Sequence, residues 1–416
     1  MRTSALRNRN YLVYFCGNTV SLHGLWVYRV ALGWLAWELT GSEFWVGVVA
    51  FTQFAPAVLF GPIFGVLADR FDRRAASLLI NSMSTLNMLL LTLLTAFGKT
   101  DIWLLAVLST MQGTLDGAHM PVRMALVPNL VTRAELPQLF AKRSLRSNAI
   151  SFNLSRFVGP AIAGLLIATT GVASAFAFNA VSYLFVLAAL LVVRLRPAGT
   201  PRAPRRAVYH ELADGVTYVL RDPRIRLLLA VIATSAVLGR GPLELLPAFA
   251  DAVFERGAAG LAILTSAVGA GAVLAGLALA RGSDWLSFEV VAGSLLLGSQ
   301  LLLALGLSGN FWFSTVAVAA IGAMLSFCGV GSQILLQSII DDEVRGRVSS
   351  FWGMVAFGGV ALGGLLIGTL ASLYGLREVS VAAGLAGAVL SLIILLRYRR
   401  TPRREPAASD TPNEES

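Results

Sequence analysis

Three ionisable residues, Asp116, His119 and Arg123, interrupt one long apolar stretch of the chain. A titratable side chain is costly in apolar surroundings, so each of the three is a functional candidate. Their spacings of three and four residues place them roughly on one face of a helix. Asp116 and His119 could exchange protons. Arg123 lies nearer the end of the stretch, and structural pairing competes with a chemical role for it. A hydrogen-bonded core histidine is the alternative interpretation for His119, as it is for His23.

Four more charged residues, Arg29, Arg156, Arg240 and Glu244, fall inside other apolar stretches. Arg240 and Glu244 are four residues apart, the spacing of an internal ion pair on a helix, so structural pairing competes with a chemical role for them. Arg29, like Asp116, has no opposite charge nearby in the sequence, which favours a functional role for both. If the arginines face one cavity, they imply an anionic or zwitterionic substrate, or a Glu–Arg switch coupled to protonation. Neutralising a carboxylate would then shift the balance between two conformations.

The composition indicates that lipid surrounds the segments that carry these charges. The chain has 416 residues, of which 56% are hydrophobic and only 13% are charged. A soluble domain could not solvate its surface with so few charges, whereas lipid does not require this. The net charge of +10 does not indicate nucleic acid, because the basic residues recur at the ends of apolar stretches. The sequence therefore predicts a protein of the lipid bilayer with no nucleic-acid partner.

Twelve apolar segments are long enough to cross a membrane, which takes about 20 residues. Most connections between them are short, so consecutive helices must be antiparallel neighbours. The predicted fold is an all-α membrane protein with twelve transmembrane helices in two pseudo-symmetric six-helix bundles. The predicted segments are 11–38, 44–68, 75–97, 102–126, 143–168, 173–194, 224–249, 260–280, 288–308, 312–340, 348–373 and 379–397.

The longest connection is rich in proline and arginine and divides the chain in two. We predict an N-terminal bundle over 1–194, a cytoplasmic linker over 195–223, a C-terminal bundle over 224–397 and a disordered tail over 398–416. Part of the linker, Val208–Leu220, has apolar residues at helical spacing and could form a surface helix.

The two halves also contain similar segments. Ala161–Thr169 reads AIAGLLIAT and Ala361–Thr369 reads ALGGLLIGT. Two parallel repeats suit a carrier whose central site faces either side of the membrane as the halves rock. Chance similarity between two helices rich in glycine and leucine is the alternative.

The basic residues predict the orientation in the membrane. If the N-terminus is cytoplasmic, 26 of the 33 Lys and Arg residues lie on the cytoplasmic side and only Lys99, Arg256 and Arg377 lie on the external side. The other four, Arg29, Arg123, Arg156 and Arg240, lie within the predicted spans. An excess of Lys and Arg marks the cytoplasmic side. Both termini are therefore predicted to be cytoplasmic.

The stretch 61–74, between the second and third apolar segments, resembles the G-x-L-a-D-R-x-G-R-K motif of the major facilitator superfamily. The resemblance implies a conformational latch for the outward-facing state, in which Asp69 accepts hydrogen bonds from a helix of the other half and the arginines pair with acidic neighbours. A basic turn that arose by chance is the alternative. The matching residues are Gly65, Leu67, Asp69, Arg70, Arg73 and, in charge, Arg74, while Asp72 replaces a glycine.

Three further segments resemble the drug and siderophore exporter branch of that superfamily, to which the enterobactin exporter and macrolide efflux proteins belong. They are Leu6–Tyr14, Trp34–Ser42 and Ile340–Val348.

One more motif bears on the mode of transport. Gly159, Pro160 and Gly164 resemble the G-P-x-x-G-G core of the motif associated with antiporters, with Ala163 in place of one glycine. A proline kink and closely packed glycines could equally belong to an ordinary packing helix.

These features predict a proton-coupled exporter of a drug-like or siderophore-like amphipathic small molecule, working as a monomer by alternating access in a bacterial inner membrane. The alternatives are an uptake carrier or lysophospholipid flippase of the same fold, and a receptor or scaffold that does not transport. No enzyme or cofactor is predicted, because neither a metal pattern nor a phosphate loop is present. Cys16 and Cys328 are expected to be core residues without a disulfide or metal. Aromatic residues such as Trp26 could line a cavity, but none is assigned.

Overall fold

The computed structural model describes residues 8–131, 142–195, 217–219, 222–282, 285–340 and 344–401. Every regular element in these ranges is a helix. The predicted surface helix over Val208–Leu220 lies outside the described residues except for 217–219, which are helical. The predicted tail lies outside them from residue 402 onward.

The described residues form twelve long helical segments close to the predicted positions. In the first half they are α1 (Arg9–Thr40), α2 (Glu43–Arg70), α3 (Arg73–Ala96), α4 (Ile102–Leu126), α6 (Lys142–Thr170) and α7 (Val172–Val192). In the second half they are a segment that starts with α9 (Pro223–Thr234) and continues to Val253, then α11 (Gly257–Ala280), α12 (Phe288–Leu307), α13 (Phe311–Ile339), α14 (Arg345–Tyr374) and α15 (Leu376–Arg400).

Nine of these segments are long and apolar enough to cross a membrane by length and composition, counting only the residues that the structure describes. The helix α6 contributes a shorter apolar stretch, Leu154–Thr170. The other two, α1 and α4, are less apolar because they carry polar residues such as Arg29, Gln112 and Asp116. The lower hydropathy of α1 and α4 therefore coincides with the candidate site residues that they carry.

Side chains that cap helix ends explain where several helices begin. Asp72 Oδ1 accepts a hydrogen bond from the Ala75 amide at 2.7 Å and starts α3. Asp101 does the same for α4 through the Leu104 amide at 2.8 Å. Such caps pair amides that the helix itself leaves without partners. Asp72, the residue that departs from the family motif, thus has a structural role.

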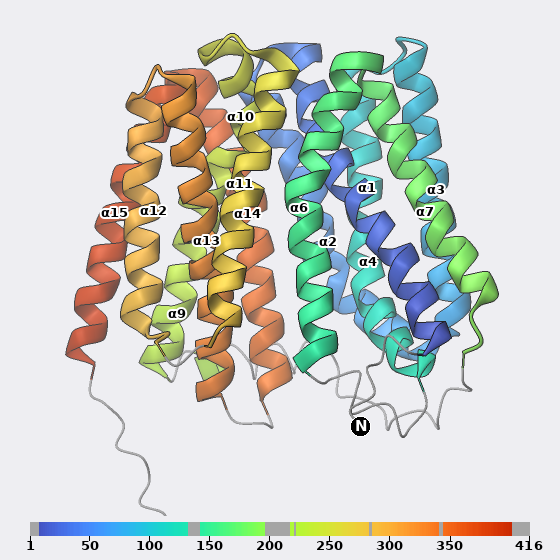
Figure 1. Ribbon diagram of the computed structural model, residues 1–416. Coiled ribbons are helices and arrows are strands. Elements are labelled where there is room, and N and C mark those ends of the chain that lie inside the picture. The colour runs from blue at the N-terminus through green and yellow to red at the C-terminus, as the bar shows by residue number, and fades with distance from the viewer. Residues whose placement is uncertain are drawn as a thin grey trace, which may run out of the picture.

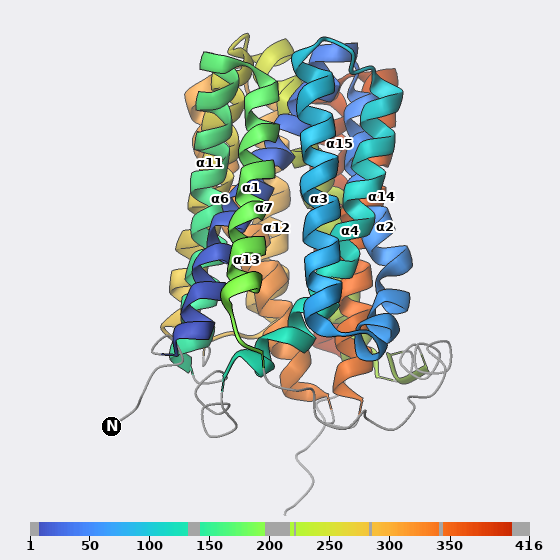
Figure 2. The same cartoon turned by 90° about the vertical axis from the view of Figure 1, so that its right-hand side faces the viewer.

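The helices gather into two groups that stand side by side (Figure 1). One group contains α1 to α7 and the other contains α9 to α15, and Figure 2 shows the first group in front of the second. Contacts between the groups run mainly through two helix pairs, α2 against α14 and α6 against α11. The segments that resemble each other in sequence, in α6 and α14, therefore occupy corresponding places in the interface.

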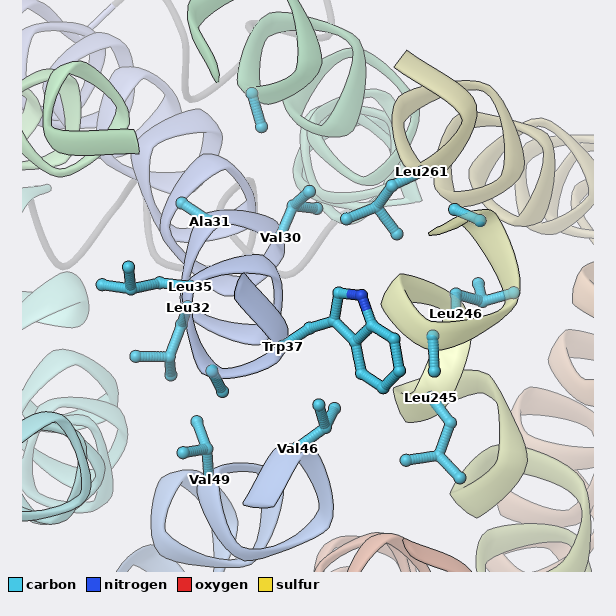
Figure 3. Packing of buried hydrophobic residues seen from close by; sticks show 14 of the residues in the cluster. Val30, Ala31, Leu32, Leu35, Trp37, Val46, Val49, Leu245, Leu246 and Leu261 are labelled. Atoms are coloured by element: carbon cyan, nitrogen blue, oxygen red, sulfur yellow. The ribbon is translucent and has the colours of Figure 1, made fainter. Parts of the chain in front are cut away.

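We call the end of the bundle that bears the first residues of α1 and the last residues of α15 the termini end, and the other the opposite end (Figure 1). A large buried cluster joins the two groups towards the opposite end; it includes Trp37 and Val46 from one group and Leu245, Leu246 and Leu261 from the other. Figure 3 shows the Trp37 indole reaching from α1 towards the segment that carries Leu245 and Leu246.

Backbone contacts and a hydrogen bond reinforce this closure. Gly47 of α2 lies so close to the Gly364 carbonyl of α14 that a Cβ there would clash with it. The Trp37 Nε1–H donates to Asp251 Oδ2 across the groups at 2.9 Å. Nearer the termini end, a Cβ built on Gly65 of α2 or Gly353 of α14 would have no atom within 4 Å. The two groups are thus packed together most closely towards the opposite end.

The two cysteines have different surroundings. Cys328 on α13 is fully buried, as expected of a core residue. Cys16 on α1 is exposed, so the expectation that it packs in the core was wrong. Both lie in predicted membrane segments, and in a membrane helix an apolar position can face lipid as readily as the core.

Candidate functional site

Arg29 of α1 and Arg156 of α6 pack against the same aromatic ring. The Arg29 guanidinium carbon lies 5.0 Å from the centroid of the Trp26 ring, and that of Arg156 lies 5.2 Å from it. Arg29 also lies 4.9 Å from the centroid of Phe54 on α2. An aromatic face attracts a cation within about 6 Å, so Trp26 holds two like charges near each other that would otherwise repel. The buried Arg29 Nε has no hydrogen-bond partner among the described residues.

Asp116 is positioned by the close packing of α4 on α2. A Cβ on Gly113 would meet the Gln53 and Thr52 carbonyl oxygens, and one on Gly117 would meet the Ala57 backbone. Only glycine permits this approach, which brings α4 against α2 on both sides of Asp116. Gln112 Nε2 donates to Asp116 Oδ1 at 3.0 Å. The buried Asp116 Oδ2 has no hydrogen-bond partner in the described part of the chain.

Arg240 and Glu244 lie in a broken helix. After α9, residues Ser235–Arg240 form a π-helical turn (η3) and Gly241–Leu245 a 3₁₀ turn (η4), followed by α10 (Leu246–Ala248) and a second π turn, η5 (Phe249–Val253). The predicted membrane-spanning segment 224–249 lies within the candidate span Pro223–Val253, but it is not one continuous α-helix. Pro242 and the close approach of Gly241 to the Gly363 backbone of α14 accompany the break.

The break changes how these two residues relate. Four residues no longer make one α-helical turn between Arg240 and Glu244, and no hydrogen bond or close ion pair joins their side chains in the described structure. They still interact electrostatically. The Glu244 Cγ lies 3.8 Å from the position of a Cβ built on Gly364, next to the contact between α2 and α14. Glu244 thus stands where the two groups of helices meet.

Arg29 connects these residues into one group. Its charge acts on Asp116, on Glu244 and on both Arg156 and Arg240. All five side chains are half-buried. We call these residues the central charge cluster: Arg29, Asp116, Arg156, Arg240 and Glu244. Three arginines against two carboxylates leave an excess of positive charge, contributed from both groups of helices.

His119 and Arg123 follow Asp116 on α4. Arg123 acts electrostatically on His119 and on Tyr14 of α1. His23 Nδ1 is 2.8 Å from the Thr19 carbonyl oxygen, one turn earlier in α1. That bond fits the interpretation of His23 as a hydrogen-bonded core histidine.

The motif between α2 and α3 is described only in part. The side chains of Asp69 and Arg70 lie outside the description, as do those of residues 345–347, so the proposed latch stays a prediction. Arg73 begins α3 and is half-buried. Arg74 Nη2 donates to the Leu191 carbonyl oxygen at the end of α7 at 2.8 Å, and this bond is to a backbone group, not to an acidic side chain.

The glycines of the antiporter-like motif make close helix contacts. A Cβ on Gly159 would lie 2.5 Å from the Trp26 Cβ, so this glycine lets α1 approach α6 beside the ring that both arginines contact. A Cβ on Gly164 would overlap the Ala262 Cβ of α11, in the other group. Pro160 lies inside α6 between these two contacts. The motif therefore brings α1, which carries Trp26, against α6, and brings α6 against α11 at the interface between the two groups.

Sequence reasoning missed two contributions to this site. Gln112, which holds Asp116, lies one helical turn before it, and a polar residue at that spacing was the available signal. The Trp37–Asp251 hydrogen bond joins residues 214 positions apart, and nothing in the sequence pairs them. Trp26 was noted as a cavity aromatic, but its contact with two arginines depends on the packing of three helices.

Comparisons with known proteins agree with this architecture. The sequence model of the family described as transmembrane secretion effector matches residues 2–415. The staphyloferrin A transporter of Staphylococcus aureus is 21% identical over 93% of this chain and 96% of that protein. The enterobactin exporter EntS of Escherichia coli is 27% identical over 90% of this chain and 86% of that protein.

Solved structures with the same fold include the nucleoside transporter NupG, with a TM-score of 0.74 and 13% identity over 94% of this chain and 99% of that one. A bacterial homologue of the human lysosomal transporter Spinster, in an inward-facing and occupied conformation, has a TM-score of 0.75 and 14% identity over 97% of this chain and 100% of that one. At these identities the likeness concerns the fold alone.

Proposed function

We propose that this chain, which belongs to the transmembrane secretion effector family of the major facilitator superfamily, exports an anionic amphipathic small molecule in exchange for protons. The protein is a multi-pass membrane transporter in its fold and family. We propose a bacterial inner membrane as its location, with both termini in the cytoplasm.

The observation that carries the substrate class is the central charge cluster. Arg29, Arg156 and Arg240 come from both groups of helices and outnumber the two carboxylates. A fixed excess of positive charge in a low-dielectric interior attracts an anion, and arginine binds carboxylate or phosphate oxygens in a planar, bidentate geometry. Trp26 and Phe54 add aromatic surface beside Arg29, which suits the apolar part of an amphiphile.

Two carboxylates in the same cluster support proton coupling. Asp116 belongs to one group of helices and Glu244 to the other, and Arg29 acts on both. When either carboxylate is protonated, its attraction to Arg29 is lost, which changes the relative energies of the states in which the groups are together or apart. An imposed proton gradient would then drive the exchange of conformations.

Similarity to the staphyloferrin A transporter and to the enterobactin exporter EntS supports a siderophore-like substrate, and the second of them also supports export. The family's description as a secretion effector also favours export. An uptake carrier or a lysophospholipid flippase of this fold, and a receptor or scaffold that does not transport, are the competing functions.

Transport into proteoliposomes with an imposed pH gradient tests the proposal. Anionic, neutral and cationic amphiphiles would be compared for wild type, Asp116→Asn and Glu244→Gln, with Glu289→Gln, an exposed carboxylate at the start of α12, as the matched control. We expect gradient-driven movement of the anions that is lost in Asp116→Asn and retained in Glu289→Gln. If movement is retained in Asp116→Asn but lost in Glu244→Gln, we would assign proton coupling to Glu244 and not to Asp116.

The remaining outcomes contradict parts of the proposal. Preference for cations would contradict the substrate class. Movement that ignores the pH gradient in every variant would contradict proton coupling. Movement only in the direction of uptake, in vesicles of known orientation, would contradict export. No movement of any compound by correctly folded protein would favour the receptor or scaffold.

A further inference from the structure

Helix α3 has a polar buried face and an apolar exposed face. Asn81, Ser84 and Asn87 are at most 2% exposed, whereas Leu79 and Leu86 on the same helix are 62% and 65% exposed. Lipid covers the apolar face without cost, but polar groups sealed inside a bundle are costly unless they are hydrogen-bonded. The polar face of α3 therefore calls for a specific partner, and at Asn87 that partner is Gln112 of α4.

Gln112 is fully buried between three helices. Its Nε2 donates to Asp116 Oδ1 on its own helix at 3.0 Å and to the Tyr183 hydroxyl on α7 at 3.0 Å. Its Oε1 accepts a hydrogen bond from Asn87 Nδ2 on α3 at 3.2 Å. Ser84 Oγ on α3 also lies 3.5 Å from Gln112 Nε2. An amide nitrogen has only two hydrogens, so the two shorter bonds, to Asp116 and Tyr183, take them.

Asn87 fixes the orientation of the Gln112 amide. Asn87 Nδ2 donates to the Leu108 carbonyl oxygen at 3.1 Å as well as to Gln112 Oε1. Because the backbone oxygen of Leu108 can only accept, Asn87 must present its nitrogen to α4, and Gln112 must then turn its oxygen towards Asn87. This leaves the Gln112 nitrogen, and only the nitrogen, directed at Asp116.

The two carboxylate oxygens of Asp116 differ in their availability to a proton. Oδ1 is occupied by the Gln112 N–H, whereas the buried Oδ2 has no hydrogen-bond partner among the described residues. The charged and titratable groups that face Asp116 from the neighbouring helices are Arg29 and Tyr28 of α1 and Tyr183 of α7. Of these, Arg29 alone carries a charge at neutral pH.

We infer that Gln112 is a positioning residue for proton coupling, which holds Asp116 Oδ1 so that the coupling proton binds at Oδ2. The proton comes from water on one side of the membrane, forms an O–H bond at Oδ2 with the carboxylate electron pair, and returns to water on the other side. The carboxylate becomes neutral and Arg29 loses its counter-charge while the proton is bound. The inference rests on the proposed proton-coupled transport and names a residue of that same site.

The pH dependence of transport tests this role. Gln112→Met removes the donor to Asp116 with little change in side-chain volume, so the ionised carboxylate loses a stabilising hydrogen bond and takes up its proton at higher pH. We expect the pH of half-maximal gradient-driven transport to rise by about one unit. Substrate exchange at equal pH on both sides, which needs folded protein but no net proton movement, should be retained.

Two asparagines of α3 provide a graded variant and a matched control. Asn87→Leu frees the Gln112 amide to turn, so the midpoint should move in the same direction by a smaller amount. Asn81→Leu removes an equally buried amide whose nitrogen donates to Ser77 of the same helix, and it should leave the midpoint in place.

The outcomes separate this inference from the proposed function. If wild-type protein shows no pH-gradient-driven transport, the proposed coupling is wrong and the role of Gln112 is wrong with it. If wild type is driven by the gradient but Gln112→Met keeps the wild-type midpoint, the coupling stands and the positioning role is refuted. An equal shift in Asn81→Leu would also refute it, because the effect would then reflect general loosening of the bundle.

Discussion

The hydrogen bond from Trp37 to Asp251 leads to the sharpest prediction. This bond joins the two groups of helices, and Trp37 belongs to the buried cluster towards the opposite end. Trp37→Phe keeps an aromatic ring in that cluster but removes the N–H. The closed arrangement therefore loses this bond, whereas a conformation with the groups apart at this end has no such bond to lose.

The magnitude follows from the type of bond. A hydrogen bond to a charged group contributes about 1.5–3 kcal/mol. Asp251 is exposed, so water competes for it and the lower value of about 1.5 kcal/mol applies. A difference of 1.4 kcal/mol is a factor of about ten in an equilibrium constant. We therefore expect the population that is open at the opposite end to rise about tenfold while it remains small.

Distances between two spin labels measure this population. Lys99 and Gly309 are exposed at the opposite end of different groups, and a side chain at Gly309 would meet no atom within 4 Å. Both would be changed to cysteine in a Cys16→Ser background, because Cys16 is exposed while Cys328 is buried. The long-distance fraction should grow in Trp37→Phe and grow less in Asp251→Asn, which keeps an acceptor oxygen.

The matched control is Trp45→Phe. Trp45 of α2 lies near the same end, but its ring contacts are with Phe44 and Trp103 of its own group. It should leave the distance distribution as in wild type. An unchanged distribution in folded Trp37→Phe, or an equal change in Trp45→Phe, would refute the reasoning that this bond holds the closed state.

Three further predictions concern packing and binding. In Gly164→Ala the new methyl group would overlap the Ala262 Cβ, which should destabilise the closed interface by about 1–3 kcal/mol. Ala262→Gly in the same chain should restore thermal stability and transport, and failure to restore them would contradict the contact. Trp26→Leu removes the ring shared by two arginines and should weaken binding of an anionic substrate by about 0.5–2 kcal/mol in a binding titration. Trp26→Phe should weaken binding less, and equal losses in the two variants would argue against the cation–π contribution. Asn10→Ala removes the bonds between the Asn10 amide and the Arg194 backbone, and thermal unfolding in detergent should show a loss of about 1 kcal/mol that an unchanged midpoint would contradict.

Much of the fold could be predicted from the order of apolar segments. The predicted helices over 102–126 and 288–308 agree with α4 and α12 to within one residue at each end. The family also follows from sequence, because its motif lies at the junction of two such helices. Lipid explains this success: a chain in hydrocarbon must satisfy its backbone polar groups within each helix, so length and hydropathy determine where the helices lie.

The candidate site could be predicted only as a set of residues. A charge inside an apolar stretch identified Arg29, Asp116, Arg156, Arg240 and Glu244, because such charges are costly in lipid. Their grouping could not be predicted, and the helical spacing that paired Arg240 with Glu244 was misleading because the helix breaks between them. Residue spacing describes one ideal helix, whereas this helix breaks at Gly241 and Pro242, where the Gly363 backbone of α14 approaches.

The pattern of apolar and charged residues along the chain was enough to identify a helical membrane protein, the positions of its helices and the charges within them. The packing of the helices was needed to find that Arg29 acts electrostatically on carboxylates of both groups, that Gln112 holds Asp116, and that Trp37 reaches Asp251 across the interface. The two kinds of information differ in the range of the interactions behind them. Hydropathy acts on each helix separately, whereas these contacts depend on how close one helix can come to another, and glycines such as Gly113 and Gly117 set that distance in three dimensions.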